Sequence, residues 1–133
     1  MNTIDLNNRT AIVTGGSQGF GLAITNRFLE SGANVIIWDI DEEVTQKLLA
    51  DKNNKNLSAS KVDVTNFEEV QSEIKKITSK NKIDIFVNNA GITGMNAKVW
   101  DYPVEEWKKV LELDLNAVFY CCKAITPHMI ENN

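Results

Sequence analysis

A glycine-rich stretch near the start of the chain, residues 14–21, has the residue types that can hold a phosphate group. It lies between an apolar run and a segment with a helical pattern of apolar residues. Gly15, Gly19 and Gly21 allow a tight turn and a close approach of the backbone to a ligand. A helix that begins there directs its free N–H groups and the positive end of its dipole at an anion. The stretch therefore predicts a site for the pyrophosphate of a dinucleotide.

A carboxylate follows these glycines at the spacing that a dinucleotide site needs. The next apolar run, residues 34–38, ends in Asp39, 18 residues after Gly21. A carboxylate in this position, at the end of a second strand, is placed to accept hydrogen bonds from the adenosine ribose. The Lys-Ser/Thr pair of a P-loop is missing, because Leu22 and Ala23 follow the last glycine. Nucleoside triphosphate hydrolysis is therefore not expected.

The composition predicts one soluble globular domain over residues 1–133, with 43% hydrophobic and 24% charged residues. A net charge of −4 with scattered basic residues indicates no nucleic-acid surface. No apolar run approaches the ~20 residues that a membrane span needs. One histidine and two adjacent cysteines give no metal-ligand spacing. Because the first residues have no signal-peptide pattern, we expect a cytoplasmic chain without a metal, membrane or nucleic-acid partner.

Four short apolar runs, at residues 10–13, 35–38, 57–62 and 83–87, are rich in β-branched residues and predict buried parallel strands. The amphipathic segments between them predict helices, which gives an alternating α/β chain with right-handed crossovers. A last helix is predicted from Pro103 to about Met129. Its apolar residues occupy more than one face, so we expect it to be mostly buried.

Further motifs lie where the predicted strands end. Val62-Asp63-Val64 follows the third strand, Asn88-Asn89-Ala90-Gly91 follows the fourth, and Trp107 precedes the long apolar helix. With the glycine motif, they resemble the short-chain dehydrogenase/reductase family from about residue 6 onward. The resemblance implies the N-terminal half of a Rossmann-type, doubly wound parallel sheet, with strand order 3-2-1-4 and helices on both faces. The chain is also similar to members that are 3-oxoacyl-carrier-protein reductases or sugar and sugar-acid dehydrogenases.

The resemblance implies a role for each motif in binding NAD. Asp39 would hold the adenosine ribose, and its charge would repel a 2′-phosphate, so NAD is preferred over NADP. No Arg or Lys stands at positions 18, 38 or 40 to compensate. Asp63 would receive the adenine amino group beside the backbone of Val64, while Asn88 and Ala90 would line the path to the nicotinamide ribose. The pyrophosphate would be held by Gly15, Gly19 and Gly21, with the backbone of Ser17, Gln18 and Phe20.

The chain departs from the family pattern at the position of the catalytic Asn, which here is Asp114. Asn116 lies two residues further on, about 200° round a helix, so it cannot simply substitute. Either Asp114 holds the water of the proton relay, or the relay differs. Both alternatives stay open from the sequence.

A second departure concerns the catalytic Ser and the Tyr-x-x-x-Lys pair, which in the family follow the region that this chain matches. Tyr120 and Lys123 are three residues apart on an earlier helix, so we do not expect them to form that pair. We expect the NAD-binding portion of an oxidoreductase, with a hydroxyl/carbonyl substrate bound only by a longer form. The alternatives are a non-catalytic dinucleotide-binding module and, less well matched by the glycine spacing, an S-adenosylmethionine-dependent transferase. Self-association is expected through the fourth strand or the helix from Pro103.

Overall fold

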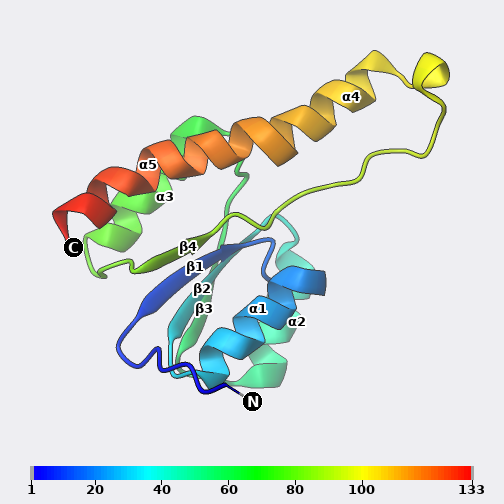
Figure 1. Ribbon diagram of the computed structural model, residues 1–133. Helices are drawn as coiled ribbons and strands as arrows, with labels where there is room; N and C mark the ends of the chain where they lie inside the picture. The colour runs from blue at the N-terminus through cyan, green and yellow to red at the C-terminus, as the bar shows by residue number, and fades with distance from the viewer. Residues whose placement is uncertain (1, 133) are drawn as a thin grey trace.

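The computed structural model describes residues 2–132 and contains a single parallel sheet flanked by helices (Figure 1). Neighbouring strands are hydrogen-bonded in the order β3-β2-β1-β4, which confirms the predicted α/β class and strand order. Each strand lies within two residues of its predicted position. The strands are β1 (Thr10–Thr14), β2 (Asn34–Asp39), β3 (Leu57–Lys61) and β4 (Ile85–Val87).

Helices cover both faces of the sheet, because alternate residues of each buried strand point to opposite sides. One apolar cluster joins β2 to α1 (Gly19–Glu30) and α2 (Glu42–Lys52). The other joins the sheet to α3 (Phe67–Thr78) and α5 (Ala117–Glu131). Figure 1 shows α3 and α5 on one side of the sheet and α1 and α2 on the other. The carboxyl ends of all four strands are therefore left free to form one edge of the molecule.

Local side-chain contacts determine where helices begin at this edge. The side chain of Asp41 accepts a hydrogen bond from the Val44 N–H at 3.1 Å at the start of α2. Asn66 does the same for the Glu69 N–H at 3.2 Å at the start of α3. These N-caps satisfy backbone donors that a helix leaves open in its first turn. They position the two loops that follow β2 and β3.

The fourth strand is shorter than predicted, because Ile83 and Asp84 make other contacts. The carboxylate of Asp84 accepts hydrogen bonds from the Thr10 N–H and the Arg9 guanidinium, each at 2.9 Å, and lies 3.4 Å from the Lys82 ammonium. Burial favours the neutral acid, but these donors outweigh it and lower the pKa of Asp84. Asp84 therefore fastens the start of β1 to the segment before β4.

The last helical region is less buried than its apolar composition predicts. It runs through η1 (Val99–Asp101), α4 (Val104–Leu111), a π-helical segment (Glu112–Asn116) and α5. Only Ala117, Cys121 and Ile125 are buried, on the side that faces the sheet and α3. Leu115 and Phe119 are 62% and 60% exposed. The expectation of a mostly buried helix is wrong, because α4 extends beyond the sheet and one face has no neighbour within residues 2–132 (Figure 1).

Within residues 2–132, no helix combines the length and the apolar character that crossing a membrane requires. A search of the same residues for clusters of three or more metal-ligating side chains also finds none.

Candidate functional site

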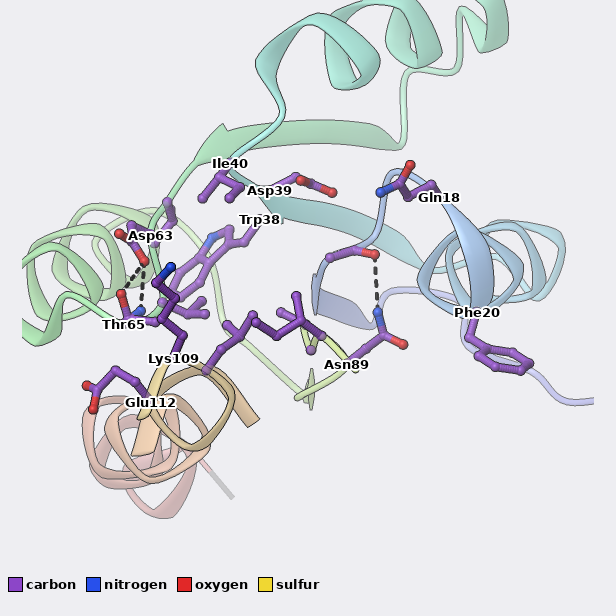
Figure 2. A pocket seen from close by; sticks show the side chains of 17 residues that line it. Gln18, Phe20, Trp38, Asp39, Ile40, Asp63, Thr65, Asn89, Lys109 and Glu112 are labelled. Atoms are coloured by element: carbon purple, nitrogen blue, oxygen red, sulfur yellow. Dashed lines mark hydrogen bonds between the residues drawn. The ribbon is translucent and has the colours of Figure 1, made fainter. Parts of the chain in front are cut away.

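A cleft with a volume of about 620 Å³ lies at the carboxyl ends of the strands. Its walls come from the loops that follow all four strands and from α4 with the adjoining π-helical segment (Figure 2). Ligands of open α/β sheets bind at this edge. Seven of the predicted cofactor residues line the cleft: Gly15, Gln18, Phe20, Asp39, Asp63, Val64 and Ala90.

The start of α1 has the properties of an anion site. Its N-cap, Gln18, has an extended backbone and makes no side-chain capping bond, and the first turn contains no acidic residue. The N–H groups of a first helical turn have no partner within the helix. Gly19 has a φ of +55°, and a Cβ built on it would meet no protein atom within 4 Å. Space is therefore left for a ligand directly at the positive end of the helix.

Gly21 lies closely against the loop that follows β1. A Cβ there would collide with the Gly15 carbonyl oxygen and would lie 2.5 Å from the Asn89 amide nitrogen. The glycine therefore allows α1 to lie directly against the loop that follows β1. It shapes the start of α1 by packing.

Asn89 and Thr14 join the loops after β1 and β4. The Asn89 side-chain amide donates to the carbonyl oxygens of Thr14 and Gly15 at 2.9 and 3.1 Å. The Thr14 hydroxyl oxygen accepts from the backbone N–H groups of Asn89 and Ala90 at 2.9 and 3.0 Å. Figure 2 shows the Asn89 side chain directed at this loop. These bonds hold the glycine loop in a fixed position at the cleft.

Asn88, which the family resemblance implies as a ligand residue, is not among the residues that line the cleft. Its side chain is exposed, and its amide lies 3.5 Å from the Cys122 sulfur. The signal that points to Asn89 is the strand order. Since β4 lies beside β1, the residues after β4 lie next to Thr14.

Asp39 is held in place by backbone groups on both sides. One carboxylate oxygen accepts from the Ser17 N–H at 3.3 Å, and the other accepts from the Asp41 N–H at 3.0 Å. Ser17 is buried, and its hydroxyl is 2.6 Å from the Thr45 hydroxyl. Because an ionised carboxylate has about four acceptor positions, Asp39 can accept two further hydrogen bonds from a ligand.

Asp63 stands at the neighbouring strand end, on the same cleft. One of its oxygens accepts from the backbone N–H and the hydroxyl of Thr65, at 2.9 and 2.7 Å. Figure 2 shows both bonds as dashed lines. The backbone N–H of Asp63 donates to Glu69 at 3.0 Å. The side chain is exposed, so the remaining acceptor positions can take a donor group from a bound base.

Two charged residues from the last helical region complete the wall of the cleft, and the sequence analysis did not identify them. Lys109 forms a hydrogen bond of 2.6 Å to Glu106, and this bond raises the pKa of Lys109. Glu112 accepts hydrogen bonds from the Tyr120 hydroxyl at 3.0 Å and from the Asn116 amide at 2.6 Å. Both residues reach the cleft because of the way α4 lies relative to the sheet. No short sequence motif predicts that arrangement.

Tyr120 and Lys123 do not interact as a catalytic pair. The hydrogen bond to Glu112 raises the pKa of Tyr120, which makes the phenol a poorer proton donor. The ammonium group of Lys123 lies over the rings of Phe67 and Phe119, at 5.7 and 5.8 Å from their centres. The structure therefore agrees with the expectation from their spacing.

Asp114 lies in the π-helical segment and contacts the loop after β4. Its Oδ1 accepts from the Ile92 N–H at 2.9 Å, close to the α-carbon face of Gly91. Asn116 is directed at Glu112 instead. Asp114 thus holds the backbone next to the cleft, without being one of the residues that line it.

Residues 9–133 match the family model described as short chain dehydrogenase. The chain belongs to the short-chain dehydrogenase family. It is 34% identical over 125 residues to a 2-dehydro-3-deoxy-L-rhamnonate dehydrogenase (NAD(+)) from a Sphingomonas species, a match that covers 93% of this chain and 49% of that one. It is 38% identical over 128 residues to a 3-oxoacyl-[acyl-carrier-protein] reductase from Chlamydia trachomatis, covering 93% and 51%.

The solved structures include a similar fold with a bound dinucleotide. A 3-ketoacyl-(acyl-carrier-protein) reductase from Brucella melitensis, complexed with NADH, has a TM-score of 0.89 and 29% sequence identity to this chain. The match covers 96% of the present chain and 53% of the Brucella reductase. The chain thus spans about half the length of these relatives.

Proposed function

We propose that the cleft binds NAD, and that the chain is the dinucleotide-binding portion of an oxidoreductase. The enzyme would transfer a hydride between the cofactor and a hydroxyl/carbonyl pair. The observation that carries the proposal is the open first turn of α1 beside Gly19, on the same strand edge as the fixed carboxylate of Asp39. A helix N-terminus suits a pyrophosphate, and a carboxylate suits ribose hydroxyls.

We assign the pyrophosphate to the backbone N–H groups of Gln18, Gly19 and Phe20. Ser17 then acts through its N–H on Asp39, and Gly15 and Gly21 act by keeping the loop close to α1. These residues bind and orient the cofactor without taking part in bond changes.

Asp39 would accept hydrogen bonds from both adenosine ribose hydroxyls with the acceptor positions that its backbone contacts leave open. Asp63 would accept from the adenine amino group, with the Val64 backbone beside it. We assign Ala90, with the exposed Asn88 near it, to the side of the cleft toward the nicotinamide ribose.

When bound, the nicotinamide supplies the hydride chemistry, and the protein supplies orientation and proton transfer. Asp114 is the candidate of this chain for the proton-transfer part, because it occupies the position of the family Asn. Its bond to the Ile92 N–H also fits a positioning role for the loop. We propose as substrate class a 3-oxoacyl thioester, a sugar or a sugar acid, since a 3-oxoacyl reductase and a sugar-acid dehydrogenase each match 93% of the chain.

Calorimetric titration of the chain with NAD, NADP and S-adenosylmethionine tests the proposal. We expect NAD to bind, NADP to bind about 10- to 150-fold more weakly because Asp39 repels its 2′-phosphate, and S-adenosylmethionine not to bind. Asp39→Ala should abolish the difference between the two dinucleotides, whereas Glu43→Gln, with the same change of charge nearby, should keep it. Equal affinities of the unmodified chain for NAD and NADP would contradict the role of Asp39.

A turnover assay on ketones and secondary alcohols, made with a longer form that supplies the family's catalytic Ser and Tyr-x-x-x-Lys pair, separates the oxidoreductase from the alternative, a non-catalytic dinucleotide-binding module. Binding with turnover supports the first, and binding without turnover supports the second. Absence of NAD binding contradicts both.

A further inference from the structure

A lysine is paired with Asp39 across the sheet, although the sequence places no basic residue beside it. The strand register pairs Asp39 with Lys61, the last residue of β3. Paired strands lie about 4.8 Å apart, so a lysine side chain can reach across the position of the carboxylate. Asp39, Glu42 and Lys61 line the same small hollow of about 30 Å³, beside the larger cleft.

Lys61 is held by a contact that can open. Its ammonium group forms an ion pair of 3.3 Å with Glu42, and the two side chains are 61% and 59% exposed. Water and salt screen such exposed pairs, so they contribute little to stability. Asp39, by contrast, is held by two backbone N–H groups and cannot turn away without losing them.

The two nicotinamide dinucleotides differ at the group that Asp39 is proposed to bind. NADP carries a phosphate on the ribose 2′ position, with close to two negative charges at neutral pH. Such a group is repelled by Asp39 and attracts a cation within reach. Among the residues lining the hollow in the described chain, Lys61 is the one cation, and its charge is offset by Glu42.

We propose that the Lys61–Glu42 ion pair modulates the nucleotide selectivity of the cleft. While Glu42 holds Lys61, the 2′ position meets net negative charge, and a hydroxyl is preferred there. When Glu42 no longer holds it, Lys61 turns to the 2′-phosphate and admits NADP. This inference rests on the proposed NAD site, and it adds to Asp39 a second determinant that acts through charge balance.

The test is a double-mutant cycle on the full chain, with calorimetric titration of NAD and NADP at about 50 mM salt. Glu42→Gln should raise the affinity for NADP about three- to tenfold, the effect of one mobile charge within a screening length of a dianion. The same substitution should leave the affinity for NAD within about twofold, since NAD has no charge at the 2′ position. Adding Lys61→Gln should remove the gain, and adding Lys61→Arg should keep it.

Glu43→Gln is the matched control, because it removes the same charge from the same helical turn without freeing Lys61. The gain in Glu42→Gln should shrink at about 1 M salt, where the screening length falls to about 3 Å. An equal gain in Glu43→Gln, or a gain that persists without Lys61, overturns the role of the pair. NAD binding with unchanged NADP affinity in Glu42→Gln overturns this inference alone. Failure of the unmodified chain to bind NAD overturns the proposed function as well.

Discussion

Alanine substitutions at two glycines in the first turn of α1 should separate ligand binding from folding. A Cβ on Gly19 meets no protein atom within 4 Å, whereas a Cβ on Gly21 collides with the Gly15 carbonyl. Gly19→Ala therefore fills only the space that we assign to the pyrophosphate. Gly21→Ala forces α1 away from the loop, whether or not a ligand is present.

The structure sets the size of each effect on stability. At Gly19 the φ of +55° costs an alanine about 1–2 kcal/mol, and the lower entropy of the unfolded chain offsets about 0.4–1 kcal/mol of that. The net loss is about 1 kcal/mol. At Gly21, overpacking costs about 1–3 kcal/mol, and weakening the Asn89 bonds to Thr14 and Gly15 adds about 1 kcal/mol. The expected loss is therefore about 2–4 kcal/mol.

Denaturant unfolding and NAD calorimetry on the two variants measure both quantities. We expect Gly19→Ala to stay folded and to lose at least about tenfold in NAD affinity, the equivalent of 1.4 kcal/mol. Gly21→Ala should lose most of its stability before any ligand is added. The reasoning is refuted if Gly21→Ala unfolds at the same denaturant concentration as the unmodified chain. Unchanged NAD affinity in Gly19→Ala would refute the assignment of the phosphate site.

Two further predictions concern the rest of the molecule. Asp84→Asn should lower the free energy of unfolding at neutral pH by about 1.5 kcal/mol, because the amide keeps an acceptor for Thr10 but loses the charge. The folded-state pKa of Asp84 is lowered, so this stabilisation is present above the ordinary carboxyl pKa and disappears as the pH falls through the lowered value. The unfolding curves of the two proteins should therefore converge in acid. A difference in unfolding free energy that stays constant with pH would contradict this prediction. We also expect self-association through the exposed apolar side of the last helices, so Leu115→Glu and Phe119→Glu should lower the mass in light scattering, while Lys52→Glu, at the exposed end of α2 on the other side of the sheet, should not. An unchanged mass in both glutamate variants would point instead to the edge strand β4.

The sequence predicts those parts of the cleft that local spacing determines. The glycine motif and Asp39 lie on one continuous strand–helix–strand unit, so counting residues along the chain is enough to bring them together. The fold class follows from four short apolar runs, together with the family resemblance that implies the strand order. Each of these signals is short-range, or is recorded directly in the residue types.

What the sequence does not predict depends on the register of neighbouring strands and on the side-chain contacts between their ends, which the implied strand order alone does not determine. Asn89 contacts Thr14 only because β4 lies beside β1, and Lys61 faces Asp39 only because β3 lies beside β2 with that alignment. The exposure of the last helices is a similar case. An apolar pattern tells which side chains avoid water, but the partner that covers them is not encoded in the helix itself.

The contacts of Asp39 also bear on how selectivity can change. Its two oxygens accept from the Ser17 and Asp41 N–H groups, so it joins the glycine loop to the start of α2, in addition to the ribose contact that we propose for it. An asparagine offers one acceptor oxygen and an NH2 group. In Asp39→Asn, the side-chain NH2 group would therefore face a backbone N–H at one of these two contacts, and two donors cannot bond to each other. The substitution would loosen the glycine loop that we assign to the pyrophosphate. Lys61 and Glu42 make no such contact with the loop, so a change there can alter the charge at the 2′ position while the phosphate site keeps its geometry.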